Sequence, residues 1–165
     1  MTSIRRPTPA LLTPEVLLGA YAQGYFPMAE ERDDADVFWL NPDPRAIIPL
    51  RTFHLPRRLA RKLRSSPWRL TVDTAFAEVI TACAEGARQS GKTWINRLIE
   101  RSYCHLHERG HAHSVEVWDG AALVGGLYGV SLGAAFFGES MFARETDASK
   151  IALAHLVARL KVGGF

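Results

Sequence analysis

A lone carboxylate, Glu139, stands in a segment whose other side chains are mostly apolar. Residues 134–142 contain three phenylalanines and a methionine, and this composition predicts a strand. An acid at such a position either faces solvent on a polar side or lies in an enclosed pocket, where an uncompensated charge is costly. A substrate ammonium group would supply the compensating charge. Glu139 is therefore the first candidate for a catalytic or amine-binding residue.

Two further strands and a helix are predicted around Glu139. Residues 115–118 alternate, with the two valines predicted on one face and Glu116 and Trp118 on the other. An Asp-Gly hairpin signal then precedes the apolar run 121–130. The three glycines of that run suggest that another backbone or a ligand comes close. After residue 147 the apolar spacing becomes helical, so three consecutive strands are expected to lead into a helix.

The second candidate site is a basic segment. Between Arg51 and Arg69 the chain has seven basic residues and no acid, and Pro56 is predicted to open a helix to about Leu63. Surface helices usually mix acids with their basic residues, because opposite charges three or four positions apart stabilise the helix. This helix is either a solvated surface helix or a binding site for nucleic-acid phosphates. The candidate phosphate-binding residues are Arg57, Arg58, Arg61, Lys62 and Arg64.

Other reactive side chains give weaker signals. Four histidines fall within residues 105–113, but no carboxylate or cysteine completes a ligand set, so no metal site is predicted. Cys83 and Cys104 have no metal-binding or redox spacing, which is typical of reduced thiols in a cytosolic protein. Ser140 lacks the second glycine of a hydrolase nucleophile turn.

Length and composition favour an ordinary globular protein. The 165 residues fit one domain, or one domain with a small appendage, and the net charge is only +3. No apolar run reaches membrane-spanning length, and prolines interrupt the stretch after Arg5-Arg6. We expect a cytoplasmic protein that does not insert into a membrane.

The order of the elements predicts an α+β fold. A small mixed segment is followed by a strand and two helices, then by three strands and a helix, which favours a mostly antiparallel sheet with flanking helices. Residues 1–12 are expected to be loosely attached, and Thr13-Pro14 is a helix start.

Several motifs together resemble leucyl/phenylalanyl-tRNA–protein transferases, which move an amino acid from aminoacyl-tRNA onto the N-terminus of a protein. The matches run in order along almost the whole chain: AYAQGYFPM (20–28), FWLNPDPRAIIPL (38–50), FHLPRRLARKL (53–63), TWI (93–95), GHAHS (110–114), SVEVW, LVGGLYGV, FFGESMF and ASK-AL.

The resemblance implies a function and a domain division. Residues 51–165 would form an N-acetyltransferase-like domain, and residues 1–50 a small N-terminal domain. The enzyme would transfer Leu or Phe, with Met as a further donor, to proteins that carry N-terminal Arg or Lys, and so mark them for degradation by the N-degron pathway. It would act as a cytoplasmic monomer that needs no metal or other cofactor.

The resemblance also implies roles for particular residues. Glu139 would sit in the aminoacyl pocket, and Trp39 and Trp94 would lie where the terminal adenosine of the tRNA is held, since aromatic rings stack well on bases. The pocket walls would be Leu127, Phe136, Met141, Leu153 and Leu156, which by sequence alone are equally good core residues.

Two other functions stay open. A coenzyme-A-dependent N-acyltransferase needs a glycine-rich turn at a helix N-terminus for the pyrophosphate, whereas residues 143–147 contain no glycine and two acids. A non-catalytic RNA-binding module would use only the basic helix, and Glu139 would then be dispensable.

The family pattern continues beyond this chain. In the family the glycine pair that matches Gly163-Gly164 opens a further strand, whose Asp and Gln lie beside the aminoacyl ester. The resemblance therefore implies that the chain lacks the family's C-terminal part, and we expect little or no transfer by these 165 residues alone.

Overall fold

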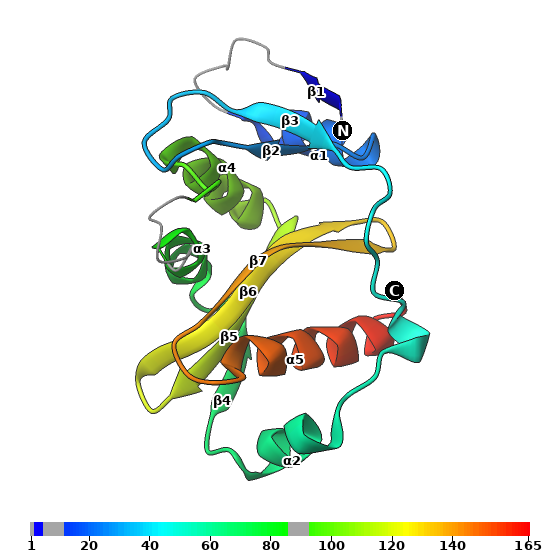
Figure 1. Cartoon of the computed structure of the whole chain (residues 1–165), viewed down its shortest axis with the longest axis vertical. Coiled ribbons are helices and arrows are strands. Elements are labelled where there is room, and N and C mark those ends of the chain that lie inside the picture. The colour runs from blue at the N-terminus through cyan, green and yellow to red at the C-terminus, as the bar shows by residue number, and fades with distance from the viewer. Residues whose placement is uncertain (1, 5–11, 86–92) are drawn as a thin grey trace.

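The N-terminal part of the molecule is a small sheet with one helix. The computed structural model describes residues 2–4, 12–85 and 93–165. Three short antiparallel strands form a sheet in the order β1–β3–β2 (Figure 1). The strands are β1 (Thr2–Ile4), β2 (Phe26–Met28) and β3 (Phe38–Asn41), and helix α1 (Pro14–Ala22) precedes β2.

The start of α1 follows from its first residues. Thr13 is the N-cap, and its hydroxyl accepts a hydrogen bond from the Val16 amide at 3.4 Å. Gly24, with φ of +83°, takes the left-handed conformation just after the helix. The expectation that residues 1–12 are loosely attached was wrong where they are described, since residues 2–4 pair with β3 and Leu12 is fully buried. Residues 5–11 lie outside the described part.

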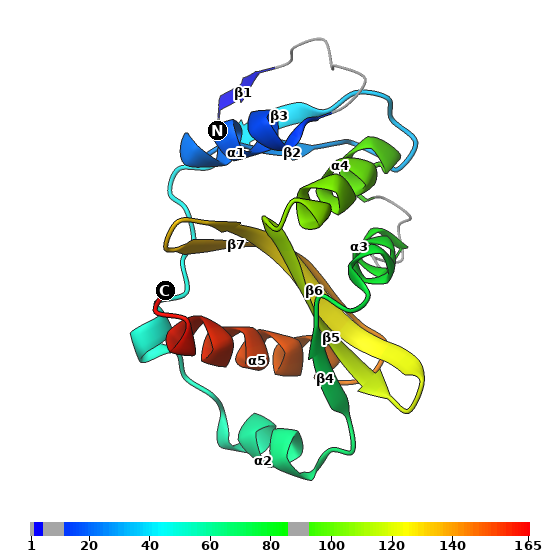
Figure 2. The same ribbon diagram turned by 180° about the vertical axis from the view of Figure 1, so that it is seen from behind.

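The remaining elements surround a four-stranded antiparallel sheet with the order β4–β5–β6–β7 (Figure 2). Hairpins join its last three strands at Gly120 and Gly133, both with positive φ, and the first of these turns is the one that the Asp-Gly signal predicts. The elements in order are the short 3-10 helix η1 (Leu50–Thr52), α2 (Arg57–Ser65), β4 (Arg69–Val72), α3 (Phe76–Glu85), α4 (Arg97–Glu108), β5 (Ala112–Asp119), β6 (Ala122–Leu132), β7 (Ala135–Ala143) and α5 (Ala148–Val162).

Both faces of this sheet are covered. On one face a core of α1, α3 and α4 side chains packs against the sheet, and on the other face α5 and Leu59 of α2 form a second core. The views in Figures 1 and 2 agree that α5 lies between the sheet and α2, while α3 and α4 lie on the side of the small sheet. The predicted α+β class with a mostly antiparallel sheet is confirmed.

Strand β5 differs from the sequence prediction. The alternation predicts one polar face with Glu116 and Trp118. Glu116 is instead fully buried, on the face of the sheet that α3 covers. Its carboxylate accepts hydrogen bonds from the hydroxyls of Thr71, Thr74 and Ser114 at 2.5, 3.0 and 2.5 Å. These three donors satisfy the acid within the protein, so a charged residue occupies a position that alternation assigns to the surface.

The glycines of β6 allow close packing, as the sequence predicts. A Cβ atom on Gly125 would lie 2.5 Å from the Cβ of Ala148, at the start of α5. A Cβ atom on Gly129 would lie 2.3 Å from the Phe137 carbonyl oxygen of β7. Only glycine fits at these points, and the first α5 residues can therefore rest directly on the sheet.

Candidate functional site

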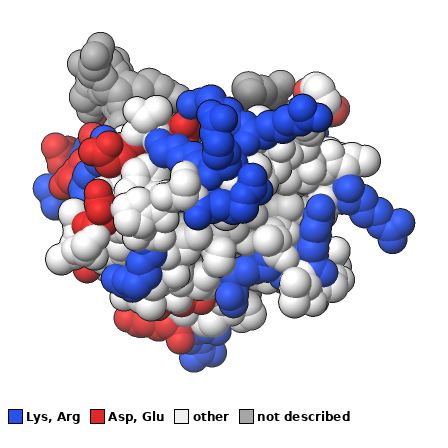
Figure 3. All heavy atoms as spheres, turned by 90° about the horizontal axis from the view of Figure 1, so that it is seen from below, with Lys and Arg blue, Asp and Glu red and all other residues white. Residues whose placement is uncertain are grey.

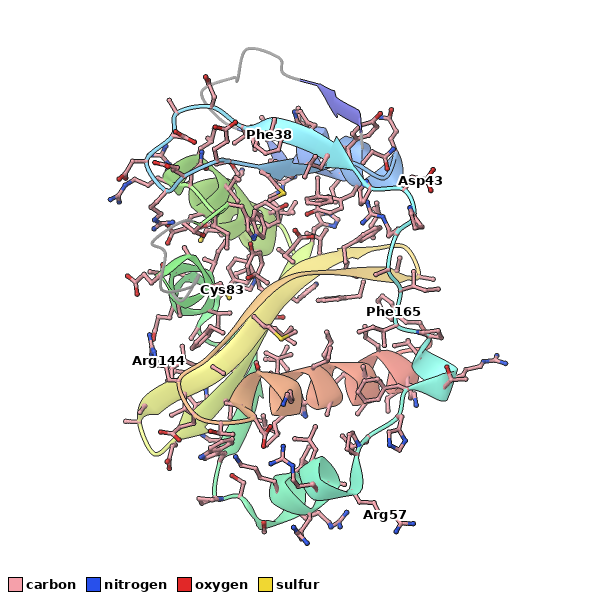
Figure 4. All side chains as sticks on the ribbon, in the orientation of Figure 1. Phe38, Asp43, Arg57, Cys83, Arg144 and Phe165 are labelled. Atoms are coloured by element: carbon pink, nitrogen blue, oxygen red, sulfur yellow. The ribbon has the colours of Figure 1, made fainter. Side chains whose placement is uncertain are left out.

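The carboxyl group of Glu139 faces the core on the α1 and α4 side. The register of β6 and β7 shifts between the pairs Tyr128–Ser140 and Gly129–Gly138, which leaves Glu139 as the extra residue of a β-bulge. Its carboxyl group hydrogen-bonds with the Tyr21 hydroxyl of α1. Figure 4 shows side chains filling the space between the small sheet and the β6–β7 hairpin.

Three tyrosines surround this carboxyl group, and the sequence analysis did not single them out. The hydroxyls of Tyr21 and Tyr103 hydrogen-bond to each other, and the rings of Tyr103 and Tyr128 pack edge to face with centroids 5.7 Å apart. Burial is the main reason that the pKa of each tyrosine is raised, and the charge of Glu139 raises it further. The Tyr128 hydroxyl is buried and has no hydrogen-bond partner among the described residues. The sequence carries a signal only for Tyr21 and Tyr128, which lie in largely apolar stretches of α1 and β6, whereas Tyr103 lies among polar residues of α4.

Burial changes the acidity of Glu139. The residue keeps some exposed area, but its carboxyl group is enclosed, and desolvation raises its pKa to about 7. The hydrogen bond with Tyr21 and the charge of Arg45 act in the opposite direction. Arg45 itself donates to the Gly24 carbonyl at 2.6 Å and lies over the Phe26 ring. An acid of this kind changes its protonation near neutral pH and can respond to a cation brought beside it.

The two predicted tryptophans lie on the same side of the sheet as this carboxyl group. Trp39 and Trp94 are partly buried and pack against the core that contains Tyr21 and Tyr103. Trp39 is in β3, opposite Pro27 of β2, and the carbonyl of Trp94 accepts a hydrogen bond from the Ala29 amide at 3.0 Å. Both tryptophans therefore belong to the layer between the small sheet and the larger one.

The predicted pocket walls gather on the opposite face. Met141 pairs with Leu127 across β6 and β7, so it shares that face, where it is 47% exposed. Met141 follows Glu139 by two positions, which in a regular strand would place both side chains on one face, and the bulge at Glu139 instead places Met141 on the opposite face. The core on the α5 face includes Leu127, Phe136, Leu153 and Leu156.

Helix α2 forms where it is predicted, and its basic residues fall into two groups. Arg57, Arg61 and Arg64 are exposed and make no ion pair with any described residue. Arg58 and Lys62 instead lie 3.0 and 3.8 Å from a carboxylate oxygen of Asp147. Figure 3, seen from the α2 side, shows Lys and Arg side chains across much of this face.

The absence of acids inside α2 does not leave all of its charges uncompensated. From the sequence, α2 is expected to be either a solvated surface helix or a binding site for nucleic-acid phosphates, because no acid lies among its basic residues. Asp147, which lies far away in the sequence, supplies an internal negative charge for two of them. Arg58 and Lys62 are therefore paired within the protein, and the phosphate-binding role of the five basic residues stays a prediction.

The histidines near the start of β5 contact an acid rather than one another. His113 Nδ1 lies 2.8 Å from a carboxylate oxygen of Asp73, and His107 Nδ1 lies 4.0 Å from the other oxygen. The hydrogen bond with Asp73 raises the pKa of His113. No group of three potential metal ligands occurs in residues 2–4, 12–85 and 93–165. No helix in that same part of the chain is long and apolar enough to cross a membrane.

Comparison with known proteins agrees with the motifs. The sequence model of the leucyl/phenylalanyl-tRNA protein transferase family matches residues 47–165, and the model of that family's N-terminal domain matches residues 10–43. The chain belongs to this family. The aminoacyltransferase family identified from the sequence motifs is thereby confirmed.

Two relatives illustrate how similar this chain is to other leucyl/phenylalanyl-tRNA–protein transferases. The protein of that name from Phenylobacterium zucineum is 60% identical over 149 residues, which cover 90% of this chain and 67% of the relative. The one from Afipia carboxidovorans is 57% identical over 154 residues, which cover 93% of this chain and 68% of the relative. The chain therefore spans about two thirds of the length of these relatives.

Proposed function

We propose that this chain carries the donor site of an enzyme that transfers Leu or Phe, and also Met, from aminoacyl-tRNA to proteins with N-terminal Arg or Lys. The main support is family membership, since the two relatives bear the name of this reaction. The products would be marked for degradation, and the enzyme would act in the cytoplasm as a monomer. We also propose that residues 1–50 form a separate small domain and residues 51–165 the transferase domain.

The reaction is the aminolysis of an ester. The α-amine of the acceptor attacks the carbonyl carbon of the aminoacyl ester, a C–N bond forms, and the C–O bond to the tRNA breaks. The tRNA hydroxyl leaves with the proton that the amine loses. An N-terminal amine has a pKa of about 7.7–8.0, so much of it is already neutral near pH 7. The protein mainly has to position the two substrates and stabilise the oxyanion.

Glu139 is proposed to bind the α-ammonium group of the donor amino acid. Its buried carboxyl group has a pKa of about 7, and a bound ammonium group would favour the charged form of this acid. The hydroxyl of Tyr21 would hold the carboxyl group in place from the α1 side. The tryptophans Trp39 and Trp94 on the same side are proposed to receive the terminal adenosine by stacking.

The side chain of the donor is proposed to reach the other face of the sheet. β7 is at the end of the strand order, so its outer edge pairs with no other strand among the described residues. At this edge Gly138 has no neighbour within 4 Å of a Cβ position, and Met141 is half exposed. A donor lying along this edge would direct its ammonium group toward Glu139 and its apolar side chain toward the wall residues Leu127, Phe136, Met141, Leu153 and Leu156.

The tRNA is proposed to bind through its phosphates to α2. The exposed residues Arg57, Arg61 and Arg64 would make these contacts without reading sequence, and Arg58 and Lys62 add positive charge beside them. A helix that is only a solvated surface element usually has acids beside its basic residues, whereas the exposed arginines of α2 have none. Binding of this kind weakens steeply as the salt concentration rises.

A comparison of donors tests the proposed function. An Arg-initiated peptide is incubated with this chain, extended with the remaining sequence of one of the two relatives, and with either labelled Leu-tRNA or labelled acetyl-coenzyme A. We expect label on the peptide from Leu-tRNA only. Label from acetyl-coenzyme A would instead support a coenzyme-A-dependent acyltransferase. Binding of tRNA without labelling by either donor would support a non-catalytic RNA-binding module.

A further inference from the structure

Asp147 is the point at which helix α2 is joined to helix α5. Oδ1 of Asp147 accepts hydrogen bonds from Arg58 Nη2 and Lys150 Nζ, both at 3.1 Å. Oδ2 lies 3.0 Å from Arg58 Nη1 and 3.8 Å from Lys62 Nζ. Only 1% of the Asp147 side chain is exposed. One enclosed carboxylate is therefore shared by two cations of α2 and one of α5.

The backbone at this point is also unusual. Asp147 has φ of +70°, the left-handed conformation, and it immediately precedes the first residue of α5. Its side chain does not cap the helix by a hydrogen bond, which leaves both oxygens directed to the basic residues. Lys62 also donates a hydrogen bond to the Thr146 carbonyl. Two consecutive residues before α5 thus bind side chains of α2.

The start of α5 is itself held rigidly against the sheet. Ala148 follows Asp147 directly and sits where a Cβ atom on Gly125 of β6 would come within 2.5 Å. Asp147 therefore has a fixed position relative to β6. Because Arg58 and Lys62 contact Asp147, they fix the position of α2 as well. Apolar contact between α2 and the α5 core comes from Leu59, the one buried residue of α2, and from the partly buried Leu63, so the ion pairs add to a small apolar contact.

We propose that Asp147 is a positioning residue that holds α2 in the orientation required for tRNA binding, acting through Arg58 and Lys62. This inference rests on the proposed role of α2 in binding tRNA. Its consequence is a division of labour on one helix. Arg58 and Lys62 fix α2 to α5, while Arg57, Arg61 and Arg64 remain available for phosphates.

Asp147 is charged under ordinary conditions. Hydrogen bonds from Lys150 and Arg58 hold the pKa of its carboxyl group below the usual value. Loss of the charge would leave three cations close together with no anion between them, and α2 would be repelled from the start of α5. Asparagine also tolerates the left-handed conformation, so Asp147→Asn changes the charge with little change in backbone preference.

The first experiment is a double-mutant cycle on thermal unfolding. Arg58→Ala and Asp147→Asn should each lower the melting temperature by about 2–4 °C, and the double variant should be no less stable than either one. Arg61→Ala is the matched control, because it removes an exposed cation of the same helix. Arg61→Ala should lower the melting temperature only slightly, and this change should add to the change caused by Asp147→Asn. Additive effects of Arg58→Ala and Asp147→Asn would overturn the proposed link.

The second experiment measures tRNA affinity at several salt concentrations. Arg61→Ala should reduce the log–log salt slope by about 0.7–0.9, because one phosphate contact is lost. Asp147→Asn should weaken binding at least about threefold and leave the slope unchanged, because the contacts remain but α2 is less well placed. Lys150→Ala leaves Arg58 and Lys62 paired with Asp147, so it should change the tRNA affinity little.

The outcomes separate this inference from the proposed function. If the unmodified protein does not bind tRNA, the proposed role of α2 is wrong, and the unfolding cycle still decides whether the link exists. If tRNA binds and Asp147→Asn binds it as tightly as the unmodified protein does, Asp147 does not position α2. A reduced salt slope for Arg58→Ala, equal to that of Arg61→Ala, would likewise contradict the division of labour. Should Asp147→Asn fail to fold, Arg58→Gln removes one of the two links and is measured in its place.

Discussion

The carboxyl group of Glu139 in β7 hydrogen-bonds with the hydroxyl of Tyr21 in α1, and this contact joins the two parts of the molecule. Tyr21 belongs to α1, which lies between the first two strands of the small sheet in the chain, and Glu139 belongs to the edge strand of the larger sheet. The hydroxyl of Tyr103 in α4 extends the contact to a third element. The proposed amine site is therefore assembled from residues that are distant in the sequence.

Glu139 is expected to make stability depend on pH. The pKa of its carboxyl group is raised to about 7 in the folded protein, above the ordinary value of 4.5, so the folded state holds the proton more firmly. The contribution of Glu139 to stability is present below pH 4.5 and is lost as pH rises toward 7. A pKa shift of this size changes the free energy of unfolding by roughly 3 kcal/mol, and partial exposure of the residue reduces this change.

The variant Glu139→Gln provides the measurement. Glutamine stays neutral, so its free energy of unfolding should fall less between pH 5 and 7 than that of the unmodified protein, as chemical denaturation at each pH would show. In the version extended with the remaining sequence of a relative, in which all transfer is measured, the same substitution should allow folding and abolish transfer of Leu. Parallel stability curves for the two proteins would mean that Glu139 is not an enclosed acid, and normal transfer would remove its amine-binding role.

Tyr21→Phe tests the contact from the other side. The hydrogen bond with Tyr21 lowers the pKa of Glu139, so its loss should raise that pKa further. The acid side of the pH profile for transfer should then move to higher pH. The Tyr103 hydroxyl also loses its partner, and the free energy of unfolding should fall by about 1–3 kcal/mol. A pH profile identical to that of the unmodified protein would contradict the contact.

The wall residues are expected to differ in their response to truncation. Leu127 is only 3% exposed, so Leu127→Ala should cost about 2–5 kcal/mol of stability by creating a cavity. Met141 is 47% exposed, so Met141→Ala should leave the melting temperature almost unchanged. It should still alter the ratio of Leu to Phe transfer, by up to about 1–3 kcal/mol in the transition state. An unaltered ratio would exclude Met141 from the proposed pocket.

Two glycines offer a matched test of the contact between α5 and the sheet. Gly125→Ala would place a Cβ atom 2.5 Å from the Cβ of Ala148 and 3.1 Å from its carbonyl carbon, and should destabilise the protein by about 1–3 kcal/mol. Gly138→Ala on β7 meets no atom within 4 Å and should be neutral within about 0.5 kcal/mol. Equal melting temperatures for the two variants would show that α5 does not rest on β6 at this point.

Features that depend on local sequence were predictable. The hairpin turns at Gly120 and Gly133 need positive φ, and glycine marks them directly. Asn96 directly before α4 is a residue type that favours helix N-caps, and its side chain accepts a hydrogen bond from the Ile99 amide at 2.8 Å. Proline and the leucine spacing indicated α2 in the same way. These signals act within a few residues, so the sequence carries them without knowledge of the fold.

Features that depend on tertiary contact were not predictable. Asp147 lies 89 positions from Arg58, and nothing near α2 shows that an acid would meet it. The bulge that turns Glu139 away from Leu127 is an irregularity of pairing, whereas alternation assumes a regular strand. Glu116 is buried because three hydroxyls from two strands and a turn converge on it. Each of these three features depends on residues from another element of the fold.

The central claim is that Leu is transferred from its tRNA to the α-amine of a protein with N-terminal Arg, and the mass of an acceptor peptide tests it most directly. Leu-tRNA is incubated with an Arg-initiated peptide, using this chain and a version extended with the remaining sequence of one of the two relatives. The account predicts that the extended protein adds one leucyl residue to the peptide, that Glu139→Gln in the same protein does not, and that a peptide with an acetylated α-amine stays unchanged. An unmodified mass with the extended Glu139 protein, or addition to the acetylated peptide, would contradict the account.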